Sequence, residues 1–250
     1  MKKTVSVPQG AELLSITQDR LLEKAYLEAS NINLAPYETI VTIEDIKGAI
    51  DGIGFPCVLK TISERHNGKD RFVLQSEEDI LKAAYLLKRG TCVLEAWIPF
   101  ERELSVMVVR NQANQVIVFP VTENIHRDRT LHESIVPARV NHYVEEEIER
   151  IARTMAEKLE LIGVLGIEMF ITSSGTLYVN ELIPRPHHSG NYSMEACSLS
   201  QYDAHIRAIC GWPLPEMELL SPAVMTTILT EHEEAAKVQI QLKPNWNFYY

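Results

Sequence analysis

Two acidic residues and an amide lie on two predicted strands that are joined by a tight turn. Glu168 falls inside an apolar strand, Asn180 and Glu181 fall in the next one, and the turn occupies residues 173–175. Counting back from the turn places Glu168 opposite Asn180 or Glu181, where facing side chains are about 5 Å apart. A buried carboxylate needs a partner, and two carboxylates beside an amide can hold Mg²⁺ together with phosphate oxygens and waters. A satisfied pair on a solvent-facing edge explains the same spacing equally well.

Basic residues follow an apolar strand earlier in the chain. Lys60 ends the strand predicted for residues 55–61, where an ammonium group can face a phosphate. The Asn-Gly-Lys turn at 67–69, with His66 beside it, can form a basic loop that covers phosphates. A solvated strand end and a plain surface turn remain open as the alternatives.

Two further segments have the composition of a ligand site. The Glu-Ala-Trp-Ile segment at 95–98 follows a predicted strand and can present a backbone edge and an acceptor to a purine and its ribose. Exposed acidic residues at a strand end are the alternative there. The loop 184–191 contains Arg185, His187 and His188 ahead of a helix N-terminus, a combination that suits an anion.

The elements that must position these residues mix helix–strand alternation with antiparallel hairpins. A helix is predicted from Thr17, as N-cap, to Ser30, which places Arg20 in its first turn. The sequences at 42–45 and 76–79 predict capping boxes before short helices. Further strands are expected at 91–98, 103–110, 115–121, 163–171, 176–182 and 224–229, a helix at 144–161, and a polar segment at 122–139. This order predicts the α+β class.

Composition limits the classes of function. The chain has 250 residues, 46% of them hydrophobic and 23% charged, which predicts a soluble globular protein with a large core. A net charge of −10 argues against broad binding to nucleic-acid polymers or anionic membranes. The four cysteines have no CxxC spacing, which favours reduced thiols in the cytoplasm. Glycine is scarce, at 11 residues, so a proposed phosphate site must be explained with few glycines.

The run 180–214, which begins Asn-Glu-Leu-Ile-Pro-Arg-Pro-His, together with Glu168 closely resembles the N5-carboxyaminoimidazole ribonucleotide synthases. The segments at 7–10, 19–20 and 120–126, and Glu95, fit the same pattern in the same order. The resemblance implies an ATP-grasp fold, in which two α+β subdomains grip ATP between antiparallel sheets. It further implies a cytoplasmic, homodimeric ligase of purine biosynthesis that is also known as the phosphoribosylaminoimidazole carboxylase ATPase subunit.

The reaction that the resemblance implies is the carboxylation of 5-aminoimidazole ribonucleotide with ATP and bicarbonate, through carboxyphosphate. Its cofactors are ATP and Mg²⁺. The residues that correspond to ATP contacts are Arg20, Lys60, Gly68, Lys69, Glu95, Ala96, Trp97, Ile98, Glu103, His126, Asn180 and Glu181. Glu168 and Glu181 correspond to the metal ligands, and Arg185 and His187 to the catalytic residues. Substrate contacts correspond to His66, Asn67, Lys69, Arg185, His187, His188 and Ser189.

The resemblance also divides the chain. Residues 1–23 would lead in from an N-terminal family domain, 24–100 would form the small subdomain with its phosphate loop at 64–71, and 101–214 the large subdomain with the metal site. Residues 215–250 would begin a C-terminal domain, so that most of both terminal family domains lies outside the sequence.

Three departures keep alternatives open. Both terminal domains are largely missing, the glycine-rich loop keeps only Gly68, and the usual His-Asn-Ser-Gly-His is here His-His-Ser-Gly-Asn at 187–191. One alternative is another ATP-grasp carboxylate–amine ligase with a different acceptor. The other is a catalytically weak nucleotide-binding module.

Overall fold

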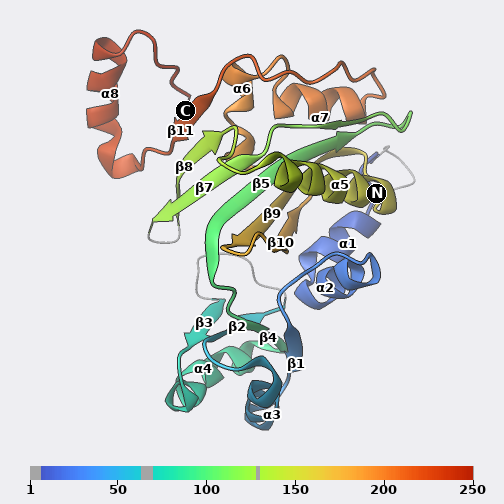
Figure 1. The fold of residues 1–250 in the computed structure, drawn as a ribbon, viewed down its shortest axis with the longest axis vertical. Coiled ribbons are helices and arrows are strands. Elements are labelled where there is room, and N and C mark those ends of the chain that lie inside the picture. Colours follow the sequence, from blue (N-terminus) through green and yellow to red (C-terminus); the bar gives the residue numbers. More distant parts are fainter. Residues whose placement is uncertain (1–6, 63–69, 128–129, 250) are drawn as a thin grey trace.

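The computed structural model describes residues 7–62, 70–127 and 130–249. Its strands form two sheets, a smaller one of four strands and a larger one of seven (Figure 1), and all the strand pairings between their named strands are antiparallel. Helices cover both sheets, which confirms the predicted α+β class.

The smaller sheet has the order β1-β4-β2-β3. Its strands are β1 Tyr37–Ile40, β2 Cys57–Thr61, β3 Arg71–Leu74 and β4 Cys92–Ala96. Side chains alternate across each strand, so Leu59 and Leu94 enter the core with Ile46 of α3 (Ile43–Ile53). Lys60 and Glu95 therefore leave from the opposite face. The remaining cover comes from the short helical turns Glu77–Asp79, Ile80–Ala83 (α4) and Ala84–Arg89.

The larger sheet has the order β10-β9-β5-β7-β8-β11, and β6 pairs with β5. Its strands are β5 Phe100–Arg110, β6 Val116–Val118, β7 Thr122–Arg127, β8 Thr130–Val136, β9 Gly163–Thr172, β10 Leu177–Ile183 and β11 Ala223–Thr226. α5 (His142–Lys158) packs on one face, and α6 (Ser193–Ala196) and α7 (Gln201–Ile209) lie on the other. The long β5 runs down toward the smaller sheet (Figure 1).

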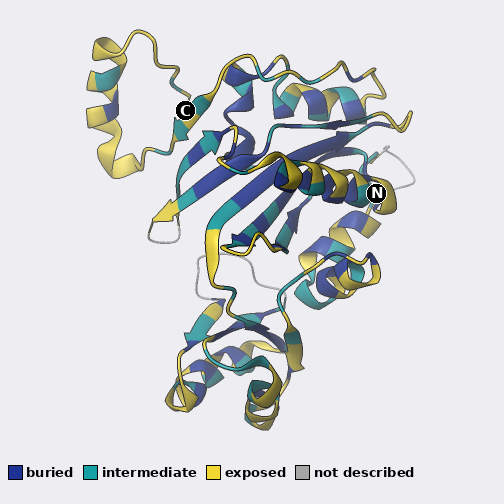
Figure 2. Ribbon diagram, in the orientation of Figure 1, coloured by how far each residue is buried: buried dark blue, intermediate teal, exposed yellow. Residues whose placement is uncertain are grey.

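Alternation along β5 explains how one face of the larger sheet can be both core and site. Leu104 and Val106 belong to the core under α5. Met107 and Val109 belong to the core on the other face, shared with α7. Glu103 and Ser105 lie on this second face closer to the smaller sheet. The face is thus apolar where helices cover it and polar toward the junction of the two sheets, as the burial colours along β5 illustrate (Figure 2).

The helix predicted from Thr17 is divided in the structure into α1 (Glu12–Gln18) and α2 (Arg20–Ala29). The predicted N-cap was wrong: Asp19 caps α2 by accepting from the N–H groups of Leu21 and Leu22, whereas Thr17 lies inside α1 and its hydroxyl bonds the Leu13 carbonyl. Arg20 does occupy the first turn, as expected.

α2 packs on the core of the larger sheet. Leu27 and the following Ile32 belong to the cluster under α5. The subdomain boundary expected at residue 24 therefore falls inside α2, and the first strand of the smaller sheet begins only at Tyr37.

Two other local expectations differ from the structure. Residues 122–139, expected as a polar segment, contain the hairpin β7–β8, because the buried Asn124 and Ser134 satisfy each other by hydrogen bonds instead of forming an apolar pattern. At 42–45 the capping box is complete, but Ser76 makes no side-chain cap and only Asp79 bonds back, to the Gln75 N–H.

The C-terminal part adds the 3₁₀ turn Thr230–His232 and α8 (Glu233–Leu242), which is largely exposed (Figure 2). Among the described residues, no helix is long and apolar enough to cross a membrane.

Candidate functional site

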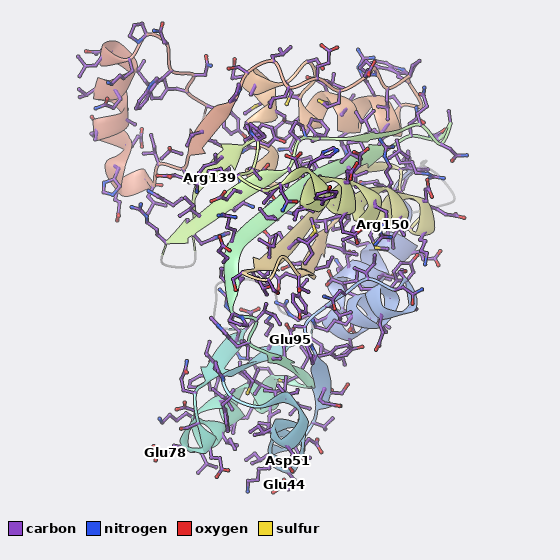
Figure 3. The ribbon with its side chains drawn as sticks, in the orientation of Figure 1. Glu44, Asp51, Glu78, Glu95, Arg139 and Arg150 are labelled. Atoms are coloured by element: carbon purple, nitrogen blue, oxygen red, sulfur yellow. The ribbon has the colours of Figure 1, made fainter. Side chains whose placement is uncertain are left out.

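A buried carboxylate with two lysines lies where the smaller sheet meets the larger one. Glu95 ends β4 at this junction, whereas Glu44, Asp51 and Glu78 lie at the far end of the smaller sheet (Figure 3). The Lys60 ammonium is 2.8 Å from Glu95 Oε2, and that of Lys24, from α2, is 3.3 Å from Oε1. We call Lys24, Lys60 and Glu95 the lysine cluster.

The two lysines determine the ionisation of Glu95. Burial alone would raise its pKa, but the charges of Lys60 and Lys24, with a smaller contribution from Arg20, lower the pKa to about 2. Burial lowers the pKa of Lys24, and Glu95 opposes that effect. The cluster carries one negative and two positive charges when all three groups are ionised, so it holds an excess positive charge that suits a phosphate.

The segment after Glu95 offers less backbone than the sequence suggested. The Ala96 N–H donates to the Pro36 carbonyl and the Trp97 N–H to the Pro56 carbonyl. These two groups are therefore occupied, and a purine edge would have to use the rest of segment 95–98. The Trp97 side chain is partly exposed beside it.

Arg20 connects the two stems of the predicted phosphate loop. Its Nε donates to the Thr61 carbonyl at 3.0 Å, and its Nη2 lies 2.9 Å from the Asp70 carboxylate. The predicted loop residues His66, Asn67, Gly68 and Lys69 lie outside the described residues. Asp70, at a position where the family has glycine, thus serves as an anchor for Arg20.

The predicted pair of acidic residues faces each other across β9 and β10. Glu181 is the register partner of Glu168, and a bulge between Val179 and Glu181 adds Asn180, whose side chain hydrogen-bonds Glu168. Ser105 of β5 pairs with Glu168 on its other side. The turn and the strand alternation therefore place all three predicted residues together.

The groups near the acidic pair shift the pKa of Glu168 upward. Burial and the Glu181 charge raise the pKa of Glu168 to about 7, and only His126 and the Asn180 hydrogen bond oppose this. No group of three His, Cys, Asp or Glu side chains within the described ranges could hold a metal ion by itself. The donors fit Mg²⁺, which commonly takes one or two carboxylates and completes its shell with phosphate oxygens and water. We call Glu168 and Glu181 the acidic pair, and Asn180 is the amide beside it.

Glu103 and His126 join the acidic pair to the rest of the site. They form an ion pair between β5 and β7, and the hydrogen bond that the His126 ring donates to Glu103 raises the pKa of His126. Arg71 of the smaller sheet opposes this and lowers that pKa, so charged residues of both sheets act on His126. Asn124 beside them hydrogen-bonds Ser105 at 2.8 Å.

The loop after β10 holds His187 in a fixed orientation. Gln201 of α7 accepts from the His187 N–H and donates to its carbonyl, at 3.0 and 2.8 Å. The Ser189 hydroxyl is 2.9 Å from His187 Nδ1. Asn191, which departs from the family pattern, turns inward and accepts from Gln201 and Tyr202.

His187 points its other nitrogen at the acidic pair. Its Nε2 lies 3.7 Å from Glu168 Oε1, and burial, with Arg185 and His188 nearby, lowers its pKa to about 4. The imidazole is therefore neutral at pH 7 and can accept or relay a proton. Gly166, two residues before Glu168 in β9, leaves room for Met107, because a Cβ there would lie 2.8 Å from the Met107 side chain.

The remaining predicted residues of the loop differ in exposure. Arg185 and His188 are exposed, and the Arg185 guanidinium donates to the Pro186 carbonyl. Ser189 is buried, with its hydroxyl on the His187 ring. A separate cavity of about 480 Å³ lies between the start of α5 and the β9–β10 turn, and no predicted site residue lines it.

Sequence reasoning missed Lys24, Glu23 and Gln201. Glu23 is buried and its carboxylate accepts from the Leu182 N–H. A signal was present in α2, because Arg20, Glu23 and Lys24 share a helix face with the apolar Leu27. Gln201 gave no signal, since its partners are set by the fold of the loop.

Comparison with known proteins identifies relatives over the whole chain. Residues 25–202 match the ATP-grasp domain family. The N5-carboxyaminoimidazole ribonucleotide synthase of Bacillus subtilis (strain 168) is 41% identical over 249 residues, which cover 100% of this chain and 66% of that relative. The chain therefore spans slightly less than two thirds of the length of this curated relative.

Solved structures give the same result. An ADP complex of purK, N5-carboxyaminoimidazole ribonucleotide synthetase, superposes with a TM-score of 0.92 at 45% identity, covering 96% of this chain and 64% of the other. The Aspergillus clavatus N5-carboxyaminoimidazole synthase, in complex with ADP and 5-aminoimidazole ribonucleotide, gives a TM-score of 0.89 at 28% identity, with coverages of 96% and 65%.

Proposed function

The chain belongs to the ATP-grasp family, and from this premise we propose that it catalyses the ATP- and bicarbonate-dependent carboxylation of 5-aminoimidazole ribonucleotide. The product would be N5-carboxyaminoimidazole ribonucleotide. The observation that carries the proposal is that the lysine cluster and the acidic pair lie on the two sheets that meet at one junction. Similarity to synthases over the full chain, including one solved with this ribonucleotide, supports the choice of acceptor.

The proposed roles follow from charge and position. Lys60 would neutralise phosphate oxygens of ATP, while the segment 95–98 and the Glu103–His126 pair would contact the nucleotide. Glu168 and Glu181 would hold Mg²⁺, with Asn180 beside them. The metal would neutralise the charge that develops on the transferred phosphoryl group.

In the proposed first step, a bicarbonate oxygen forms a bond to the γ-phosphorus as the bond to ADP breaks, which gives carboxyphosphate. In the second, the exocyclic amine attacks the carboxyl carbon and phosphate leaves. Arg185 would bind the anionic carboxyl donor. The neutral His187, held by Gln201 and Ser189, is placed to accept the proton that the amine loses.

A second acceptor remains a candidate because of the phosphate loop. Asp70 replaces a family glycine and is paired to Arg20, so the loop stem differs from that of the synthases. A homodimer in the cytoplasm is the assembly and location that the family resemblance implies, and light scattering of the purified chain would test the dimer.

Phosphate release tests the proposed function. The protein is incubated with ATP, Mg²⁺ and bicarbonate, with and without 5-aminoimidazole ribonucleotide. Release that requires the ribonucleotide is expected, and release that requires another amine instead would exclude this acceptor. Calorimetry that detects no Mg²⁺-ATP binding would remove both ligase activities for this chain. Glu181→Gln should weaken Mg²⁺-dependent nucleotide binding, because it removes a charged ligand, and Glu147→Gln, in an exposed ion pair with Arg150 on α5, is the matched control.

A further inference from the structure

The first turn of α2 bonds three separate parts of the site. Arg20 contacts both stems of the phosphate loop, at Thr61 and Asp70. Glu23 accepts from the N–H of Leu182 in β10, and Lys24 pairs with Glu95 of β4. Side chains from one short stretch of α2 therefore contact strands of both sheets.

Helix geometry explains why these contacts come from neighbouring residues. Positions 20, 23 and 24 are spaced i, i+3 and i+4, so their side chains lie on one face. Glu23 and Lys24 are adjacent, so their side chains leave the helix about 100° apart, one toward Leu182 of the larger sheet and the other toward Glu95 of the smaller. Because the helix backbone between them is rigid, a shift of β10 relative to β4 must strain at least one of the two contacts.

Burial makes these contacts costly to build for stability alone. Glu23 is 4% exposed and Lys24 is 5% exposed. Removing two charged groups from water costs free energy that offsets much of the gain from their new contacts. Apolar residues of similar volume often stabilise such positions as well or better. A role in fixing geometry accounts for charged residues where Leu27, one turn later, is apolar.

The endpoints of the contacts are next to the ligand residues. Leu182 directly follows Glu181 and pairs with Ile167, the neighbour of Glu168. Lys24 holds the oxygen of Glu95 that Lys60 does not. Neither Glu23 nor Lys24 is among the residues proposed to contact nucleotide or metal.

We propose that Glu23 and Lys24 are positioning residues that couple the acidic pair on β9 and β10 to Glu95 of β4 and its partner Lys60, so that metal binding at the acidic pair improves nucleotide binding at Lys60 and Glu95. The inference rests on the proposed function only in assuming that the site binds Mg²⁺ and a nucleotide. It assigns the coupling to two side chains that contact neither ligand.

The test measures the affinity of a hydrolysis-resistant ATP analogue by calorimetry, in EDTA and in saturating Mg²⁺. The ratio of the two dissociation constants is the Mg²⁺ factor. We expect Glu23→Met, which removes the acceptor for the Leu182 N–H, and Lys24→Met each to lower this factor by about fivefold or more. The double variant should lose less than the product of the two single losses, because both act through one helix turn. Lys24→Arg, which keeps the ion pair, should retain the factor.

Glu28→Gln is the matched control, because Glu28 is an exposed residue of the same helix. It should leave the factor unchanged. Glu23→Gln keeps an acceptor for the Leu182 N–H, so it should retain the factor, as Lys24→Arg should.

A Mg²⁺ factor that stays at the wild-type value in whichever of Glu23→Met and Lys24→Met fold would overturn the inference, even if both affinities fall in parallel, since a purely structural role would change them together. A wild-type protein that binds the nucleotide without a Mg²⁺ factor would also overturn it. A wild-type protein that binds no nucleotide at all would instead contradict the proposed function.

Discussion

Two buried carboxylates, Glu95 and Glu168, lie on the two sheets that meet at the site, and their pKa values are shifted in opposite directions. Burial raises the pKa of both, but the lysines bring that of Glu95 down to about 2, whereas the Glu181 charge helps to raise that of Glu168 to about 7. Burial therefore does not decide the ionisation by itself. The lysine cluster contains its own counter-charges, whereas in the acidic pair two carboxylates face each other.

The largest expected effect tests the counter-charges of Glu95. Glu95→Gln leaves Lys24 and Lys60 without their carboxylate, and removing one partner of a buried ion pair typically costs about 3–5 kcal/mol. Urea unfolding at pH 7 measures the free energy of unfolding. Glu147→Gln, which breaks only an exposed pair with Arg150, should cost about 1 kcal/mol or less. Equal losses in the two variants would show that the cluster is not desolvated as described.

The next effect is the pH dependence of the same carboxylate. The folded-state pKa of Glu95 lies below the ordinary value of 4.5, so its contribution is fully present above pH 4.5 and is lost as the pH falls toward 2. About 3 kcal/mol is at stake, since one pKa unit corresponds to about 1.4 kcal/mol. The difference in unfolding free energy between wild type and Glu95→Gln should therefore shrink across this range. A constant difference from pH 7 to pH 3 would contradict the shift.

The last effect has the opposite sign and is expected at the other carboxylate. The folded-state pKa of Glu168 is raised, so its contribution to stability is present below pH 4.5 and is lost as the pH rises through about 7. At pH 8 without metal, Glu168→Gln should therefore raise the unfolding free energy, by up to about 3 kcal/mol on the same conversion of pKa into free energy. A loss as large as that of Glu95→Gln would mean that the acidic pair already has a cationic partner.

The acidic pair could be predicted from the sequence because it depends on local geometry. A tight turn fixes the register of a hairpin, and strand alternation then places Glu168 opposite Glu181. The sequence indicated the bulge that adds Asn180 only as an uncertainty of one residue in the predicted register of the two strands. The two sheets were likewise predictable from alternating apolar residues and turn signals.

The contacts of α2 could not be predicted from the sequence in the same way. Arg20, Glu23 and Lys24 have the spacing of a solvated charged face, and nothing local shows that this face is buried between two sheets. Their partners at Asp70, Leu182 and Glu95 are far away in the chain and follow only from tertiary packing. The β7–β8 hairpin was missed for a related reason, because buried polar residues there bond one another.

The central proposal is that Glu168 and Glu181 together bind the divalent cation of the site. Titration of Mn²⁺, as a paramagnetic substitute for Mg²⁺, against the protein with bound ADP measures this most directly, with free Mn²⁺ followed by electron paramagnetic resonance. Glu168→Gln and Glu181→Gln should each weaken Mn²⁺ binding by about tenfold or more, as expected for loss of a charged ligand, while Glu147→Gln should not. Wild-type Mn²⁺ affinity in both site variants would contradict the claim and place the metal elsewhere.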